Sequence, residues 1–162
     1  MSELKTPFMK RGTAIFLRVV IVLIGSGAVA FMLWEPHVEG RNAQATLFDI
    51  YFKDPFLAYA YLASTPFFVA LYQAFTLLGH IEKNKASPLN SARALRTIKY
   101  CALALTGLIA APVAYLFIAR PGDDIAGGVA MGLFLIIVSG VVAAAAAVIE
   151  RRLRAAGDRG RL

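Results

Sequence analysis

The sequence is poor in the residues that catalytic and metal-binding sites usually need. It contains one cysteine, so no disulfide can form within the chain, and it contains two histidines. Its long apolar runs hold no aspartate or glutamate, so a carboxylate relay of the kind that proton pumps use would have no carriers. No paired-carboxylate, CxxC, HExxH, nucleophile-elbow or phosphate-binding-loop pattern occurs. These absences argue against an enzyme, and we expect no cofactor and no catalytic, metal-binding or cofactor-binding residues.

Apolar residues are what the chain has in abundance. They make up 59% of the 162 residues, and the mean hydropathy of +0.65 is too high for an ordinary soluble domain. Four apolar runs are long enough to cross the hydrocarbon core of a bilayer, and they cover residues 14–34, 55–78, 101–118 and 126–149. The sequence therefore predicts an all-α, polytopic membrane protein, a bundle of four transmembrane helices that forms a single domain over residues 1–162.

The first apolar run admits two interpretations. Ala28-Val29-Ala30 resembles the cleavage site of a signal peptide behind a basic N-terminus. The run continues through residues 31–33, however, and Arg18 interrupts what would be the hydrophobic region, so an uncleaved first span is favoured. A formal GxGxxA pattern at residues 25–30 lacks the strand and turn of a dinucleotide site, and small residues for close helix packing explain it better. We expect Arg18, which has no acidic partner in its span, to extend to the inner head groups.

Positive charge is concentrated in three segments of the chain. Fourteen of the seventeen lysines and arginines lie in the N-terminal segment up to Arg18, in an elbow at residues 79–100, and in a tail at residues 150–162. Because short loops rich in Lys and Arg stay in the cytoplasm, both termini are expected there, with His37 and His80 on opposite sides of the membrane. This topology accounts for the net charge of +7 without direct nucleic-acid binding. The tail would contact the anionic lipids of the inner leaflet.

The elbow joins the second and third apolar runs. Ser87 followed by Pro88 is typical of a helix N-cap with proline in the first turn. Apolar residues then recur at helical spacing, namely Leu89, Ala92, Leu95 and Ile98. The sequence thus predicts a basic amphipathic helix that either lies along the inner membrane surface or leads directly into the third span.

We also expect kinks at two prolines and particular structures in two outer segments. Pro66 and Pro112 lie inside the second and third spans, where a proline usually kinks the helix. Residues 35–54 form the largest outer segment, in which residues 47–52 (LFDIYF) are expected to lie in the membrane interface. Residues 119–125 (ARPGDDI) have the composition of a tight outer turn.

Polar and small residues within the spans indicate contacts between helices. Gln73 is expected to hydrogen-bond across to another helix. Gly128 and Gly132 form a GxxxG pattern, and Gly140, Ala144 and the alanine run at residues 143–147 extend this small-residue face. We expect the fourth span to pack closely against other helices of the same chain rather than against a second copy.

The stretch QAFTLLGHIEKNKASPLNSARALRTIKYCA, residues 73–102, resembles the bacterial membrane family known as Domain of Unknown Function 2975. The features in common are Pro66 in the second span, IEKNK at residues 81–85 and ALRTIKY at residues 94–100. They extend over about the last two thirds of the chain, although Ser87-Pro88 stands where members often have an aromatic residue. The resemblance implies a four-span, multi-pass protein of the bacterial cytoplasmic (inner) membrane with no established activity.

Members of that family are often encoded beside small helix-turn-helix regulators, which implies a membrane protein that sequesters or signals to a cytoplasmic transcriptional regulator. We therefore expect a regulatory or interaction protein that contacts a soluble partner through polar and basic residues of the elbow. These residues are Lys83, Asn84, Lys85, Arg93 and Arg96.

The alternative function is a small transporter or exporter component. In this interpretation a path through the membrane opens at the proline kinks of the second and third spans. Three intramembrane polar residues would line it, namely Tyr72, Gln73 and Thr106.

Overall fold

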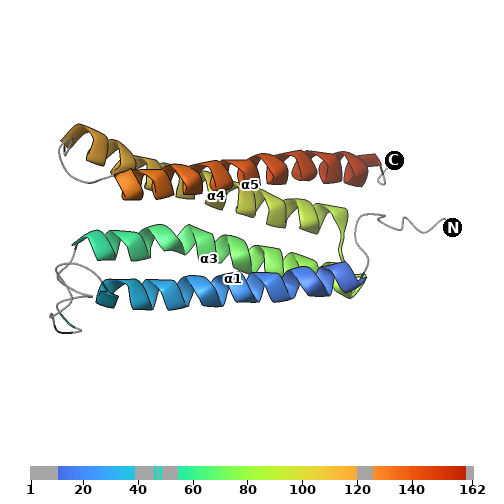
Figure 1. Cartoon of the computed structure of the whole chain (residues 1–162). Helices are drawn as coiled ribbons and strands as arrows, with labels where there is room; N and C mark the ends of the chain where they lie inside the picture. Colours follow the sequence, from blue (N-terminus) through green and yellow to red (C-terminus); the bar gives the residue numbers. More distant parts are fainter. Residues whose placement is uncertain (1–10, 39–45, 47, 49–54, 120–125, 160–162) are drawn as a thin grey trace.

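The computed structural model describes residues 11–38, 46, 48, 55–119 and 126–159, which form four long helices (Figure 1). These are α1 (Arg11–Val38), α3 (Pro55–Glu82), α4 (Pro88–Ala119) and α5 (Ala126–Arg159). All four are long and apolar enough to cross a membrane, and the described residues contain no strand. The structure therefore confirms the predicted all-α architecture with four membrane-spanning helices.

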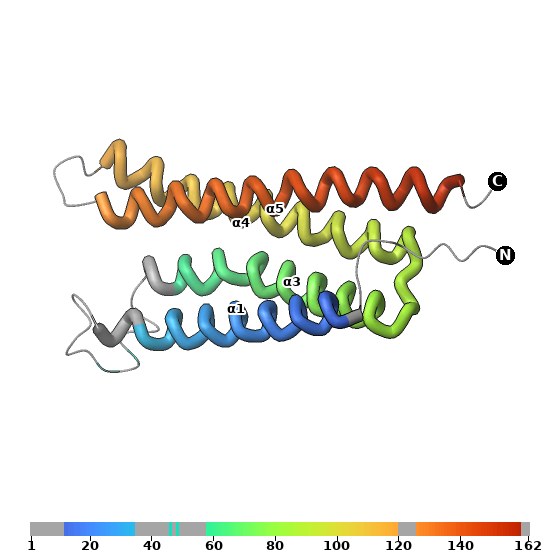
Figure 2. The backbone as a smooth tube through the Cα atoms, turned by 45° about the vertical axis from the view of Figure 1, so that its right-hand side comes forward, coloured from blue at the N-terminus to red at the C-terminus, as the bar shows by residue number. Residues whose placement is uncertain are grey.

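The helices run alternately up and down, as both ribbon views show (Figures 1 and 2). The start of α1, the turn between α3 and α4 at residues 83–87, and the end of α5 lie together at one end, here called the elbow end. Each helix packs mainly against its neighbours in sequence, most extensively α4 against α5, and α1 and α5 share no extensive contact. The molecule is consequently an open bundle in which α1 rests on α3.

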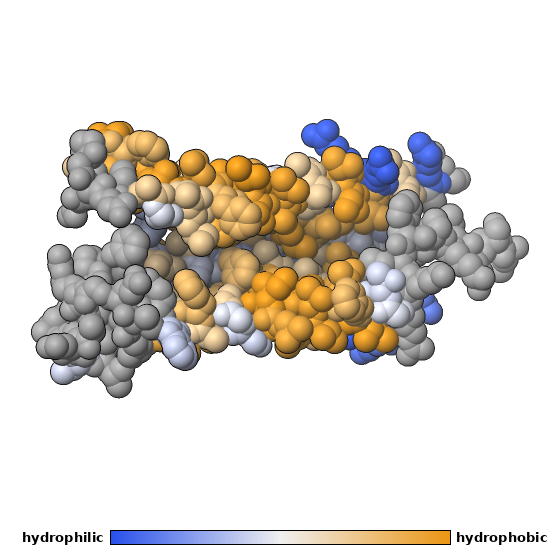
Figure 3. Space-filling model, in the orientation of Figure 1, coloured by the Kyte–Doolittle hydropathy of each residue, from blue (hydrophilic) through white to orange (hydrophobic). Residues whose placement is uncertain are grey.

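Large apolar side chains face outward and small ones lie between the helices. Leu23 and Ile137 are each about two-thirds exposed, whereas Ala92, Ala102 and Ala143 are buried. Figure 3 shows the apolar surface across the middle of the molecule, with hydrophilic side chains gathered at the elbow end. This inverts the pattern of a soluble domain, because in lipid the helices associate through close backbone approach and leave large apolar groups for the acyl chains.

The closest approach between helices is at Gly132, where α5 meets α4. A Cβ atom built on Gly132 would overlap Cγ2 of Val113, so the contact requires glycine. The same construction at Gly128 and Gly140 meets nothing within 4 Å, and Ala144 is exposed. The predicted close packing is thus confirmed at Gly132 and, in the alanine run, at the buried Ala143 and Ala146, but it was wrong at Gly128, Gly140 and Ala144. The buried residues of α5 are Val129, Gly132, Ser139, Ala143, Ala146 and Glu150.

The helices extend beyond the apolar runs that predicted them. α4 begins at Pro88, where the amide of Ser91 donates to the carbonyl of Ser87 at 2.9 Å, as expected for an N-cap at Ser87. The amphipathic segment after Pro88 therefore leads directly into the third span. Pro66 and Pro112 lie inside continuous helices. The predictions for the outer segments 47–52 and 119–125 fall largely outside the described residues.

An ion pair joins α1 to α3 at the elbow end. Arg18 Nη1 lies 2.6 Å from Glu82 Oε2, and the guanidinium lies 4.2 Å from the centroid of the Phe75 ring. The guanidinium also lies over Gly79, where an added Cβ would be in van der Waals contact with Arg18 Cζ at 3.6 Å. The ion pair gives Arg18 a partner that its own span lacks, and its contact with lipid head groups stays a prediction. Its partner is an acid at the end of a different helix, which an inspection of the first span alone could not find.

A second ion network joins α4 to α5. Glu150, which is only 5% exposed, accepts from Lys99 Nζ at 2.6 Å and lies 2.9 Å from Arg154 Nη2. One turn beyond Arg154, a Cβ atom built on Gly157 would lie 3.1 Å from the Leu89 side chain of α4. The described part of the tail is thus a continuation of α5 that packs on the start of α4. Its contact with anionic lipids stays a prediction for the exposed side chains of this segment.

Substituting Gly132 by alanine should destabilise the α4–α5 contact. The added methyl group overlaps the stiff, β-branched Val113, and such overpacking costs about 1–3 kcal/mol. Gly140→Ala is the matched control, since it adds the same group where nothing lies within 4 Å. Unfolding in mixed detergent micelles should show a loss for Gly132→Ala, recovery on adding Val113→Ala, and no loss for Gly140→Ala. Equal behaviour of the two glycine variants would contradict this packing.

Removing either partner of the Arg18–Glu82 pair should destabilise the attachment of α1. Each single change, Arg18→Met or Glu82→Gln, leaves a partly buried polar group unpaired, at an expected cost of about 1–3 kcal/mol. The double variant should lose less than the sum of the two. A double-mutant cycle on unfolding in micelles measures the coupling, and strictly additive losses would show that the two side chains do not interact.

Candidate functional site

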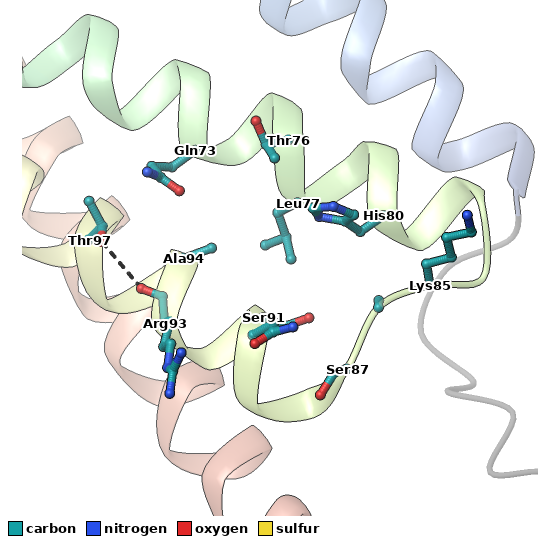
Figure 4. A pocket seen from close by; sticks show the side chains of 12 residues that line it. Gln73, Thr76, Leu77, His80, Lys85, Ser87, Ser91, Arg93, Ala94 and Thr97 are labelled. Carbon is teal, nitrogen blue, oxygen red and sulfur yellow. Dashed lines mark hydrogen bonds between the residues drawn. The ribbon is translucent and has the colours of Figure 1, made fainter.

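A polar pocket lies between α3 and α4 at the elbow end, with a volume of about 360 Å³ (Figure 4). Its lining comes from one face of α3, from the turn, and from the first three turns of α4. The lining residues are Gln73, Thr76, Leu77, His80, Lys85, Ala86, Ser87, Asn90, Ser91, Arg93, Ala94 and Thr97. Most of them carry a side-chain group that can donate a hydrogen bond.

Helical spacing explains how these residues come together. One face of α3 carries the lining residues at positions 73, 76, 77 and 80, because residues three or four apart in a helix lie on the same side. Positions 90, 94 and 97 form the equivalent face of α4. The short turn folds the two helices antiparallel, so the two faces meet. Sequence reasoning singled out Gln73 but missed the polar residues that flank the elbow at the same spacing.

The pocket carries positive charge without a carboxylate. Lys85 and Arg93 line it, and no aspartate or glutamate does. Two acids at the elbow end already have partners. Glu82 on α3 is paired with Arg18, and Glu150 on α5 is paired with Lys99 and Arg154. Among the described residues, neither Lys85 nor Arg93 has an ion-pair partner. The arrangement can attract an anion and donate hydrogen bonds to it. Among the lining residues, no nucleophilic side chain is hydrogen-bonded to a side chain that could act as its general base.

The five predicted partner-binding residues all lie at the elbow end and are exposed. Lys83 and Asn84 are in the turn, where Asn84 adopts a positive φ of 52°. Lys85 and Arg93 also line the polar pocket, whereas Arg96 lies outside it, with its guanidinium 5.8 Å from the Tyr100 ring centroid. The structure therefore brings the five residues to one surface and divides them between the pocket and its surroundings.

The three predicted intramembrane polar residues do not share a path. Tyr72 is 67% exposed and lines an apolar groove between α1 and α3. Gln73 lines the polar pocket, and Thr106 donates to the carbonyl of Ala102 in its own helix at 2.9 Å. No pocket found among the described residues contains all three.

Two tyrosines, rather than Gln73, make side-chain hydrogen bonds to the backbone of a neighbouring helix. Tyr59 on α3 donates to the carbonyl of Leu108 on α4 at 2.5 Å, and Tyr61 donates to the carbonyl of Met32 on α1 at 3.2 Å. Within the described part of the chain Gln73 makes no such bond, so this prediction was wrong. The phenol groups reach neighbouring backbone from the half of α3 that lies away from the elbow end, and nothing in the sequence indicates which carbonyl accepts.

Comparison with known proteins places these features in a family. The family described as "Protein of unknown function (DUF2975)" matches residues 39–158. The curated relative named "Uncharacterized membrane protein YoaS", from Bacillus subtilis (strain 168), is 38% identical over 151 residues, covering 93% of this chain and 94% of the relative. The similarity thus reaches beyond the last two thirds of the chain. No solved structure matches. Both the family match and the relative show that this chain is a membrane protein of the DUF2975 family.

Proposed function

We propose that this chain is a regulatory or interaction protein of the bacterial cytoplasmic membrane, with the elbow end in the cytoplasm. Its elbow surface binds an acidic region of a soluble partner. We define this surface by the five exposed residues Lys83, Asn84, Lys85, Arg93 and Arg96. The observation that carries the proposal is that Glu82 and Glu150 are already paired with other cations, so the four charges of the elbow surface are left available.

The elbow surface suits reversible binding. Its cations are exposed and lie within one turn and the first turns of α4, so their fields add over a small area. Exposed charges of this kind speed association and are screened by salt, which makes the complex sensitive to ionic strength. A small helix-turn-helix regulator, the partner that the family resemblance implies, would have to present an acidic surface away from its basic DNA-binding face.

The transporter interpretation has weaker support. Tyr72, Gln73 and Thr106 lie in three different surroundings, and the described pockets do not connect them. The polar pocket is confined to the elbow end of the α3–α4 contact. We therefore favour an interaction protein over a transport path.

Neutralising the elbow surface should abolish capture of the soluble partner from native membranes. The test variant carries Lys83→Gln, Lys85→Gln, Arg93→Gln and Arg96→Gln. The control carries Arg151→Gln, Arg152→Gln and Arg159→Gln, which remove exposed positive charge from the end of α5 at the same end of the bundle. Quantitative mass spectrometry of pull-downs should show an acidic protein lost from the elbow variant and retained by the control. Identical recoveries from both correctly inserted variants would exclude the elbow surface as a binding site.

The proposed topology is tested by reporter fusions. The positive-inside rule predicts that green fluorescent protein fused after Leu162 is fluorescent and that alkaline phosphatase fused there is inactive. The same reporters inserted in the segment 39–45 should behave in the opposite way. Active phosphatase at the C-terminus would place the elbow surface outside the cell and remove the basis for a cytoplasmic partner.

A further inference from the structure

We propose that the polar pocket between α3 and α4 is a binding site for a phosphate ester, of the kind carried by an anionic phospholipid head group or by a soluble phosphorylated metabolite. The inference concerns the pocket and does not rest on the soluble partner proposed above, although Lys85 and Arg93 belong to both. Its basis is the chemistry of the lining, the enclosed volume and the depth of the pocket in the membrane.

The lining matches the hydrogen-bonding needs of phosphate. A phosphate ester presents acceptor oxygens and negative charge, and the pocket offers donors without a competing carboxylate. Arg93 contributes a planar guanidinium and Lys85 an ammonium group, which are the two cations that proteins use for phosphate. Thr76, Asn90 and the buried Ser91 add uncharged donors from both helices. Neutral donors from both helices thus line one cavity, with a charged residue, Lys85 or Arg93, on each side of it in Figure 4.

The volume of the pocket is suited to a small group. At about 360 Å³ it falls at the lower end of the range for ligand cavities, which is large enough for a phosphate with a glycerol unit. The start of α4 adds to the attraction, because the first amide groups of a helix carry partial positive charge. In Figure 4 the labelled side chains from α3, the turn and α4 surround this space.

The depth of the pocket corresponds to the lipid head groups. α4 has 32 residues and is therefore about 48 Å long, whereas the hydrocarbon core is about 30 Å thick. α4 must then extend past the core, and Arg93 lies in its first two turns while Lys85 lies in the turn just before it. Gln73 and Thr97 are the lining residues of α3 and α4 that lie farthest along the chain from the turn. A phosphate at the elbow would thus have its acyl chains beside the helices.

The first experiment identifies the source of the phosphate. The purified full-length chain in detergent micelles is titrated with short-chain phosphatidylglycerol, with glycerol 3-phosphate, and with diacylglycerol as the lipid that lacks phosphate. Saturable binding of phosphatidylglycerol alone supports a lipid head group, and binding of glycerol 3-phosphate as well supports a soluble phosphate ester. Equal binding of phosphatidylglycerol and diacylglycerol would overturn the proposal.

The second experiment separates the pocket from general surface charge. Lys85→Gln with Arg93→Gln should weaken the dissociation constant for phosphatidylglycerol by about tenfold or more, because two charge-assisted hydrogen bonds are lost. Lys83→Gln with Arg96→Gln removes the same charge outside the pocket and should change it less than about threefold. Equal losses in the two double variants would overturn the proposal.

An uncharged variant keeps the test decisive if the first pocket variant fails to fold. Thr76→Val with Ser91→Ala preserves shape and net charge while removing two donors from the lining. It should weaken binding by about three- to tenfold, and unchanged binding would contradict the assignment. Circular dichroism and elution volume of each variant establish that the helices are intact.

Discussion

The pairing of Glu82 and Glu150 with cations from other helices is the interaction on which the elbow end depends. Each carboxylate is partly or fully removed from solvent, which is unfavourable unless a cation compensates it. Arg18 supplies that cation to α3, and Lys99 and Arg154 supply it to α5. The pairs hold two helix contacts, α1 with α3 and α4 with α5, in register at one end of an otherwise apolar bundle. Because they occupy these acids, the cations of the turn and of the start of α4 keep an uncompensated positive field.

Hydropathy and local sequence signals were sufficient to predict the four helices and the residue at which α4 begins. The apolar runs are long because a backbone in lipid must satisfy its hydrogen bonds within the helix, and this leaves a strong trace in composition. Ser87 and Pro88 mark the start of α4 through local chemistry. Hydropathy did not predict where the helices stop, because a helix continues through polar residues until something terminates it. α5 accordingly runs on to Arg159.

The partners of polar residues could not be predicted, since they depend on how each helix is rotated. Arg18 and Glu82 are 64 positions apart, and Lys99 and Glu150 are 51 apart. A rotation of α3 by one residue, about 100°, would turn Glu82 away from α1. Likewise, the GxxxG pattern of α5 and its extension to Gly140 were visible in the sequence, but of Gly128, Gly132 and Gly140 only Gly132 meets a neighbouring side chain within 4 Å, because Val113 of α4 lies opposite it. Each polar residue of the pocket could be identified in the sequence. The sequence did not show that one face of α3 and one face of α4 meet to form a pocket.

The attachment of α1 has a consequence for biosynthesis. α1 rests mainly on α3, held by Arg18 at one end and by the Tyr61 hydrogen bond to Met32 at the other. Both partners on α3 lie later in the chain, so α1 leaves the ribosome before its counter-charge and its hydrogen-bond donor do. Arg18 sits two turns from the start of α1, where its long side chain can reach water during this interval. The position of the arginine thus suits a helix that inserts first and is fixed in place only when the next one arrives.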